Sequence, residues 1–509
     1  MTTPNICILI AIIAYLLLVV GIGIYFANRN KSVSDFYLGG RKLGPLVTAM
    51  SAEASDMSSW LLMGLPGVAY ATGIADAAWT AIGLAVGTYV NWLIVAKRLR
   101  KYSEIAGNAT TVPEFFSNRF HDKRHILSAI AALVIIVFFV PYTASGFSAC
   151  GKLFASLFDV DYHTAMIISA IVIVLYTAIG GFLAASTSDF MQSIVMTIAL
   201  VVILGFGTIT AGGVDSVIDN AKSLPGYFDL THVFSDGKAA DYGALTIFST
   251  LAWGLGYFGM PHILLRFMAI ENSKKLKMSR RIATVWVVIS LAVAVIIGVI
   301  GNCMSANGSL IKLKDSETII VEISKLISSH GIAAALIAGV ILAGILAATM
   351  STADSQLLAA SSSASKDILT DFFGLKISEK TSMIFARITV VVISIISVVI
   401  AWDPDSSVFQ IVSFAWAGFG AAFGPVVLFA LFWKRSNKAG ALAGMLSGGI
   451  MVFTWKFLVR PLGGAFDIYE LLPAFIVACI FMVVVSLLTE KPDPEIIKEF
   501  ETAKKACNE

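Results

Sequence analysis

Thirteen long apolar segments follow one another along the chain, and each is about long enough to cross a lipid bilayer as a helix. Backbone polar groups in a bilayer must be hydrogen-bonded within the protein, so these segments are expected to be helical. The sequence therefore predicts an all-α polytopic membrane protein with about 13 transmembrane helices. The segments lie at roughly 5–26, 45–71, 76–96, 127–155, 163–180, 187–211, 243–270, 281–303, 331–360, 382–402, 406–433, 439–459 and 469–489.

The composition excludes a soluble globular protein. The 509 residues are 57% hydrophobic and 14% charged, with a mean hydropathy of +0.85, which indicates a multi-pass membrane protein. The net charge of +3 gives no reason to expect nucleic acid, and no obligate protein partner is indicated. Five scattered cysteines favour neither a disulfide framework nor a metal cluster.

The ends of the chain are predicted to lie on opposite sides of the membrane. No basic residue precedes the first apolar run and no small-residue cleavage pattern follows it, so we interpret it as a retained helix. With the N-terminus outside, the cytoplasmic segments hold 28 of the 36 Lys and Arg residues and the external segments hold eight. The positive-inside rule favours this orientation, with the C-terminus inside.

Two apolar segments are interrupted near their middle by small or helix-disrupting residues. The second contains the stretch Ser51–Ser59, and the seventh contains the stretch Trp253–Pro261. Because the two segments are five apart, they cross the membrane in opposite directions. Paired discontinuous helices indicate an inverted-repeat secondary transporter with its site near the midplane. For either segment alone, the alternative is that glycines only permit close helix packing.

Asp56 lies inside the first interruption. An ionised side chain at bilayer depth costs at least roughly 2.5–3.5 kcal/mol on insertion scales, so it usually faces a cavity, a partner charge or an ion. In the ninth segment, Ser351, Asp354 and Ser355 fall at i, i+3 and i+4 and share one helix face, with Thr352 beside them. Hydroxyls and helix-end carbonyls are suitable ligands for sodium, although such hydroxyls also bond back to their own helix.

Two further acids have open roles. Asp189 follows a Gly-Gly pair near a membrane helix, where it either helps ion release at the cytoplasmic mouth or caps a helix as a solvated acid. Glu53 is either buried near the ion path or faces a water-filled vestibule.

Several longer motifs occur in order along nearly the whole chain. They are Ala54-Ser-Asp-Met-Ser, Trp60-Leu-Leu-Met-Gly-Leu-Pro-Gly67, Gly180-Gly-Phe-Leu-Ala184, Trp253-Gly-Leu-Gly-Tyr-Phe-Gly259, Met350-Ser-Thr352, Ala415-Trp-Ala-Gly-Phe-Gly-Ala-Ala-Phe-Gly-Pro425 and Gly440-Ala-Leu-Ala-Gly444. Together these motifs resemble the sodium:solute symporter family, and the proline-carrying members of that family match best. The resemblance implies a five-plus-five inverted repeat of the leucine-transporter type, sodium-driven uptake of L-proline by alternating access, sodium as coupling ion with no other cofactor, and a place in the cell (inner) membrane.

The resemblance also divides the chain. The parts are 1–44 (an extra helix and the first cytoplasmic loop), 45–211 (first repeat), 212–242 (extracellular loop), 243–433 (second repeat), 434–489 (two extra helices) and 490–509 (cytoplasmic tail).

Family roles carry over to individual residues. The implied sodium ligands are the carbonyls of Ala54, Met57 and Ala348 and the hydroxyls of Ser351 and Thr352. Asp56 and Ser55 would support this site without ligating the ion. The implied proline pocket is drawn from Ser58, Trp60, Tyr142, Trp253, Tyr257 and Pro261. A second ion or a release path would involve Asp189, Asp354 and Ser355.

Two positions depart from the pattern of the proline-carrying members: Ser59 replaces a usual glycine, and Met260 replaces an expected glutamine. Another small solute (an osmoprotectant, another amino acid or a small organic acid) or proton coupling therefore stays an alternative. A membrane solute sensor is a second alternative, although the tail from Lys491 is too short for a signalling domain. An enzyme is not expected, because the sequence contains no HExxH pattern, nucleophile elbow or phosphate-binding loop.

Overall fold

The computed structural model describes residues 2–27, 37–375 and 378–507. Of the cations counted for the orientation, Arg29, Lys31 and Lys376 lie outside these residues. In the first part of the chain the helices are α1 (Thr3–Ala27), α3 (Pro45–Asp56), α4 (Leu65–Thr72), α5 (Ile74–Val90), α6 (Ala96–Ile105), α7 (Val112–Arg119), α8 (Ile126–Phe158), α9 (Tyr162–Thr210) and α10 (Val214–Ser223).

The second part of the chain is also helical. Its helices are α11 (Ala244–Leu251), α12 (Pro261–Ala269), α13 (Leu276–Ala306), α14 (Ile319–Ser328), α15 (Ile332–Ser362), α16 (Glu379–Ile400), α17 (Val408–Phe432), α18 (Lys438–Thr454), α19 (Leu471–Leu488) and α20 (Pro494–Ala506). The strands β1 (His232–Ser235) and β2 (Lys238–Asp241) form an antiparallel hairpin in which His232 faces Asp241. The predicted loop 212–242 thus contains a helix and a hairpin of its own.

Nine helices within the described residues are long and apolar enough to cross a membrane. The other four predicted segments contain shorter apolar helices, at Trp60–Thr72, Tyr162–Leu175, Ala244–Phe258 and Ile384–Ile400. Two of these four belong to the segments that the sequence predicts to be interrupted. The apolar segments therefore lie where expected, while the count of 13 spans and the orientation stay predictions.

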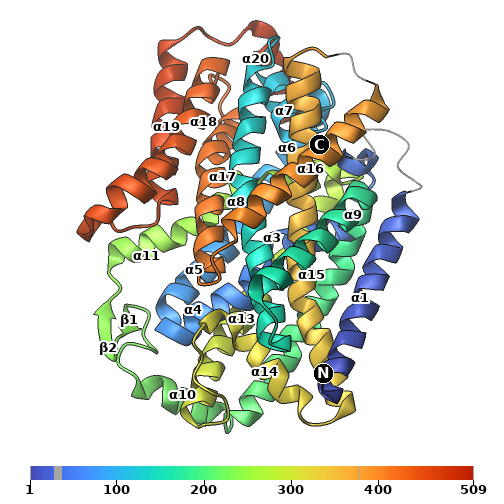
Figure 1. The fold of residues 1–509 in the computed structure, drawn as a ribbon. Helices are drawn as coiled ribbons and strands as arrows, with labels where there is room; N and C mark the ends of the chain where they lie inside the picture. The colour runs from blue at the N-terminus through green and yellow to red at the C-terminus, as the bar shows by residue number, and fades with distance from the viewer. Residues whose placement is uncertain (1, 28–36, 376–377, 508–509) are drawn as a thin grey trace.

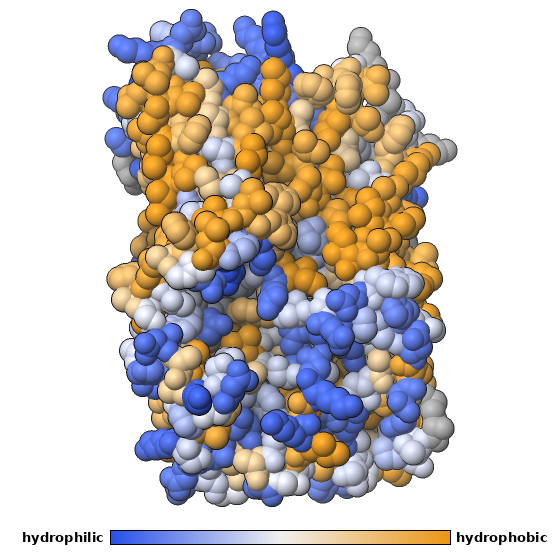
Figure 2. All heavy atoms as spheres, turned by 60° about the vertical axis from the view of Figure 1, so that its left-hand side comes forward, coloured by the Kyte–Doolittle hydropathy of each residue, from blue (hydrophilic) through white to orange (hydrophobic). Residues whose placement is uncertain are grey.

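The long helices pack into one bundle, in which α15 contacts α1, α8, α9 and α3, while α17, α18 and α19 pack against one another (Figure 1). The described chain begins at one end of this bundle and finishes at the other. Large apolar side chains are exposed along α1, α13, α16 and α19. Figure 2 shows a broad apolar belt across one face, with polar side chains gathered below it around a hollow. An apolar belt of this kind is suited to contact with lipid acyl chains.

The fifth and sixth predicted segments form a single kinked element, α9. The kink lies at Gly181, where φ is 71° and ψ is −179°. A residue with a Cβ is strongly disfavoured at such positive φ, so the Gly-Gly pair explains where the two segments join.

Both predicted interruptions are present. The first broken helix runs through α3, stops at Asp56, and resumes at Trp60 in a π-helical turn that leads into α4. The second runs from α11 through a 3₁₀ turn, η4 (Ala252–Phe258), and resumes in α12 at Pro261. The two are tied together at one end, because Leu43 N donates to Ala269 O (3.2 Å) and Glu271 N donates to Leu43 O (3.0 Å).

Candidate functional site

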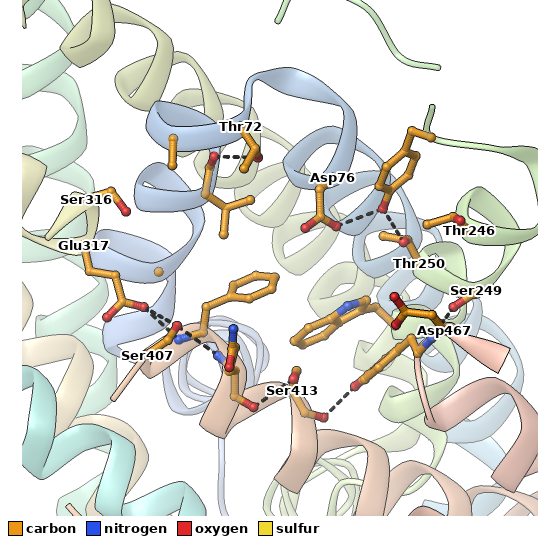
Figure 3. A pocket seen from close by; sticks show the side chains of 18 of the residues that line it. Thr72, Asp76, Thr246, Ser249, Thr250, Ser316, Glu317, Ser407, Ser413 and Asp467 are labelled. Atoms are coloured by element: carbon orange, nitrogen blue, oxygen red, sulfur yellow. Dashed lines mark hydrogen bonds between the residues drawn. The ribbon is translucent and has the colours of Figure 1, made fainter. Parts of the chain in front are cut away.

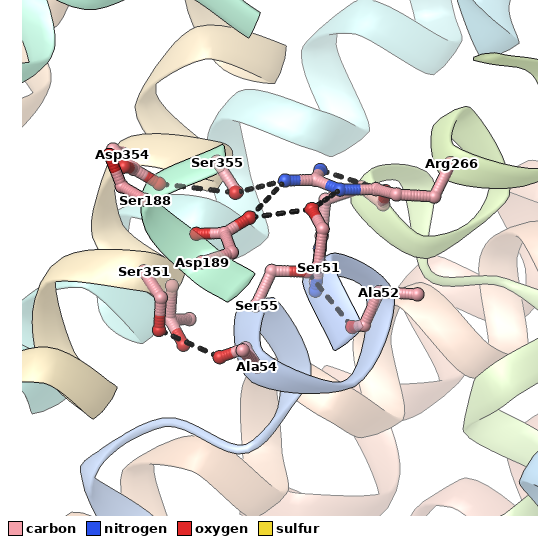
Figure 4. Close-up of polar contacts among 12 residues, drawn as sticks. Ser51, Ala52, Ala54, Ser55, Ser188, Asp189, Arg266, Ser351, Asp354 and Ser355 are labelled. Carbon is pink, nitrogen blue, oxygen red and sulfur yellow. Dashed lines mark hydrogen bonds and ion pairs between the residues drawn. The ribbon is translucent and has the colours of Figure 1, made fainter. Parts of the chain in front are cut away.

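The break in the first helix leaves carbonyl groups without their usual helical partners, because the backbone turns away at Met57 (ψ 67°). Ala54 O is one of them, and it accepts a hydrogen bond from Ser351 Oγ at 2.7 Å (Figure 4). Ser351 belongs to α15, so this bond joins the broken helix to the central helix of the bundle.

The same hydroxyl joins a second carbonyl. Ser351 Oγ and Thr352 Oγ1 are both 3.1 Å from Ala348 O. Four of the five expected sodium ligands, Ala54, Ala348, Ser351 and Thr352, thus lie within one network of direct contacts. All four are buried. The fifth, Met57, is also buried and caps α3 three residues beyond Ala54. These groups form a concentration of uncharged oxygens of the kind that binds a hard monovalent cation.

Asp56 connects this network to a group of aromatic residues. Its Oδ2 accepts a hydrogen bond from Tyr257 Oη at 2.6 Å, and its backbone carbonyl accepts from Tyr142 Oη and Trp60 Nε1, both at 3.2 Å. Its Oδ1 is buried and has no hydrogen-bond partner among the described residues. Ser55 Oγ instead donates back to Ala52 O (3.0 Å). Asp56 therefore holds residues from both broken helices and from α8 around the break.

The expected substrate residues form two sets. Ser58, Trp60, Tyr142, Trp253 and Tyr257 surround the break, and Trp60 and Trp253 have ring centroids 6.1 Å apart. Pro261 differs, because it begins α12 on the far side of the second break from Trp253.

Sequence reasoning missed two aromatic residues in this layer. Trp416 Nε1 donates to Trp253 O at 2.7 Å, and its ring lies edge-on to Tyr257 at 5.1 Å. Tyr469 stacks on Trp253 at 5.1 Å, and its hydroxyl donates to Ser413 O at 2.7 Å. Trp416 lies in one of the motifs quoted above, whereas Tyr469 belongs to the connection between α18 and α19, outside every quoted motif.

A cavity of about 780 Å³ leads to this aromatic layer from the end of the bundle that contains the β-hairpin. Its walls include the polar groups of Asp76, Glu317, Ser407 and Asp467, and Trp253 and Tyr469 also line it (Figure 3). Trp253 is only 4% exposed, and Tyr257 behind it is completely buried. The aromatic layer therefore separates an open polar vestibule from the groups around Asp56.

On the other side of the broken helix, Arg266 of α12 organises a second polar cluster (Figure 4). Its Nη2 lies 3.1 Å from Asp189 Oδ2 and donates to Ser355 Oγ at 2.6 Å. Ser51 Oγ donates to the same Asp189 oxygen (2.6 Å) and accepts a bond from Arg266 Nε (3.1 Å). Three helices and the first broken helix therefore meet at one guanidinium.

This cluster corrects two expectations. Asp189 is not a solvated cap, because it is completely buried within α9 and paired with Arg266. Arg266, one of the 28 cations assigned to the cytoplasmic side, is 1% exposed inside α12. Its only sequence signal is its position five residues after the second break, in an otherwise apolar run.

Asp354 gives the cluster a second carboxylate. Asp354 Oδ1 accepts from Ser355 Oγ at 3.2 Å, while Asp354 Oδ2 and Asp189 Oδ1 are buried without a hydrogen-bond partner in the described parts of the chain. If both acids are ionised, one guanidinium leaves a net negative charge, which would be costly at this depth. Either a proton or a further cation must neutralise it.

Glu53 is buried, so it lies in the protein interior and does not face a water-filled vestibule. It accepts hydrogen bonds from Trp92 Nε1 at 2.8 Å and from Thr88 Oγ1 at 3.2 Å. Both donors lie on the helix that follows the first broken helix, so Glu53 fixes the spacing of these two elements.

The sodium:solute symporter family matches residues 36–448. The chain belongs to this family. It is therefore a transporter and not an enzyme, and it is a multi-pass protein of the cell membrane. The sodium/proline symporters of Staphylococcus aureus strains USA300 and JH9 are both 42% identical to it over 490 residues, which cover 95% of this chain and 93% of theirs.

Solved structures show that the symporter shares a known transporter fold. A Na⁺-coupled sialic acid symporter in a substrate-bound outward-open state superimposes with a TM-score of 0.77 at 19% identity, covering 96% of this chain and 99% of that one. MHP1, a nucleobase-cation-symport-1 family transporter, gives a TM-score of 0.53 at 13% identity, covering 93% and 99% of the two chains.

Proposed function

We propose that this symporter couples inward sodium movement to the uptake of L-proline by alternating access. The support is the 42% identity to sodium/proline symporters over 95% of the chain, together with the cluster of uncharged oxygens at the first helix break. We further propose that 45–211 and 243–433 are the two inverted repeats, because each begins with a broken helix.

The proposed sodium site consists of the carbonyls of Ala54, Met57 and Ala348 and the hydroxyls of Ser351 and Thr352. The Ser351 hydroxyl now donates its proton to Ala54 O, and it would turn its lone pairs toward an incoming ion. Sodium would then bind both the broken helix and α15. This bridge would hold the two elements in the arrangement that receives substrate.

The proposed substrate pocket lies on the vestibule side of that ion. The aromatic faces of Trp60, Tyr142, Trp253 and Tyr257 suit the apolar ring of proline, and the non-helical backbone at the two breaks suits its carboxylate and amine. Ser59 Oγ is buried without a hydrogen-bond partner among the described residues, so it is available to a polar substrate group.

Alternating access requires one end of the pathway to open while the other closes. The vestibule is open to one side, whereas the buried Arg266 cluster joins α12 to α9 and α15 on the other side. We propose that the inward-open state forms when these bonds break. Low internal sodium and a negative-inside potential, about 2.3 kcal/mol per charge per 100 mV, would then drive release.

The Arg266 guanidinium also bears on the number of coupling ions. It occupies the space between Asp189 and Ser355, where a second sodium would need to sit. We therefore propose one sodium per substrate, with a proton rather than a second sodium neutralising the excess charge of the two acids, and with Asp189, Asp354 and Ser355 as part of the release path.

Uptake of labelled proline into proteoliposomes, with and without an inward sodium gradient, tests the function. Sodium-dependent accumulation above that of empty vesicles is expected. Accumulation driven equally by a proton gradient alone would contradict sodium coupling. Competition by unlabelled glycine betaine or another amino acid that exceeds competition by unlabelled proline would show that proline is not the preferred cargo.

A further inference from the structure

A second cavity, of about 320 Å³, is lined by other residues than the vestibule and lies at the end of the bundle that the positive-inside rule assigns to the cytoplasm. One wall is formed by η3 (Asn91–Val95) and the start of α6, and the other by η5 (Ser273–Lys275) and the start of α13. Its lining includes four cations, Lys97, Lys274, Lys277 and Arg280, and no acidic residue from the described chain.

None of these four cations forms an ion pair with an acid among the described residues. Lys97 Nζ donates to the backbone carbonyl of Cys507, and the Arg280 guanidinium lies 5.5 Å from the centre of the Tyr89 ring. Arg280 Nε is buried and has no hydrogen-bond partner within the described residues. The nearby Glu271 pairs with Lys275, outside the cavity lining, at 2.6 Å. The cavity therefore concentrates positive charge and leaves a buried donor unused.

An apolar surface lies next to the positively charged cavity. Leu93 lines the cavity and is 45% exposed, while Val86 and Tyr89 on α5 and Val285 on α13 are also exposed. These residues lie further along the same two helices, toward the middle of the membrane. A ligand that fits both surfaces has an anionic head at the membrane interface and apolar chains in the bilayer.

We propose that this cavity binds the headgroup phosphate of an anionic phospholipid. The phosphate would accept hydrogen bonds from Lys274, Lys277 and Arg280, and the acyl chains would lie along α5 and α13. The cavity also includes Trp92, whose Nε1 donates to Glu53 on the first broken helix and whose ring packs on Phe267 of α12 at 4.4 Å. The lipid would therefore contact a residue that touches both broken helices.

Native mass spectrometry of the purified full-length protein, titrated with phosphatidylglycerol or phosphatidylcholine, tests the proposal. The test variant is Lys274→Ala/Lys277→Ala/Arg280→Gln. The matched control, Lys123→Ala/Lys434→Ala/Arg124→Gln, removes the same charges from exposed positions on the same side. Each removed charge should weaken phosphatidylglycerol binding roughly fivefold in the test variant, whereas the control should bind as the unmodified protein does.

Three results would overturn the proposal. Equal losses in the test and control variants would show that any basic surface attracts the lipid. Equal binding of phosphatidylcholine would remove the role of the negative charge. Displacement of phosphatidylglycerol by inorganic phosphate at the same concentration would show that a free anion, and not a lipid, is the ligand. If the triple variant does not fold, Lys277→Ala alone provides the same comparison with Lys434→Ala.

Discussion

At the scale of single residues, Asp56 and Ser351 connect the first helix break to other helices. Asp56 has one carboxylate oxygen bonded to Tyr257 and one left without a partner among the described residues. Ser351 bridges two carbonyls from different helices. The Tyr257–Asp56 and Ser351–Ala54 bonds join residues far apart in sequence, so both depend on how the helices are packed.

Replacing a hydroxyl of the proposed sodium site should weaken ion binding. Ser351→Ala and Thr352→Ala each remove one oxygen ligand, so the sodium concentration for half-maximal uptake should rise on the order of tenfold. Ser361→Ala is the control, because this buried hydroxyl of α15 bonds its own helix at Leu358 O. Sodium titration of proline uptake measures the effect. A change in proline affinity alone, at saturating sodium, would show that the site is assigned wrongly.

Tyr257→Phe should reduce transport while leaving the fold intact. It deletes the only hydrogen bond to the Asp56 carboxylate within the described structure. A lost bond to a charged group costs about 1.5–3 kcal/mol, which corresponds to at least about a tenfold fall in kcat/KM for uptake. Tyr162→Phe removes a hydroxyl bonded to Ala401 O, outside the site, and should have little effect. Equal kinetics for the two variants would argue against a role for Asp56.

At the scale of elements, the second helix break depends on close packing against α17. Gly256 lies in η4, where a Cβ would come within 1.9 Å of Trp416 Nε1. The 3₁₀ turn can therefore hold Trp253 and Tyr257 in place only because this position lacks a side chain.

Gly256→Ala should destabilise the protein, because overpacking a buried site costs about 1–3 kcal/mol. Gly205→Ala in α9 has no atom within 4 Å of the added Cβ and should be neutral or slightly stabilising. The melting temperatures of the two detergent-purified variants provide the comparison. An unchanged melting temperature for Gly256→Ala would mean that α17 can move away without cost.

At the scale of the whole molecule, the structure combines an open vestibule with a closed opposite end. The aromatic layer around Trp253 forms the inner limit of the vestibule, and the Arg266 cluster closes the other end through buried polar bonds. A charged cluster at this depth is stable only while its partners remain together.

Removing one member of the Arg266–Asp189 pair should be costly. Arg266→Gln leaves buried carboxylates without a cation and should destabilise the protein by about 3–5 kcal/mol. Asp189→Asn should also destabilise it. In the double variant, the free energy of unfolding should fall by less than the sum of the decreases in the two single variants. A thermodynamic cycle from melting temperatures with and without sodium measures the coupling. Additive losses would show that the two groups do not act as a pair.

The sequence alone predicted the 13 apolar segments, both helix interruptions and the polar face of α15. A helix that crosses a bilayer needs a long run of apolar residues, so polar or helix-disrupting residues within such a run are easy to recognise. The individual roles of the site residues stay predictions. Only the tertiary structure placed Ser351 against Ala54, paired Arg266 with Asp189, and brought Trp416 and Tyr469 over the break. These contacts join residues from distant parts of the chain, so they depend on helix packing, which local hydropathy does not specify.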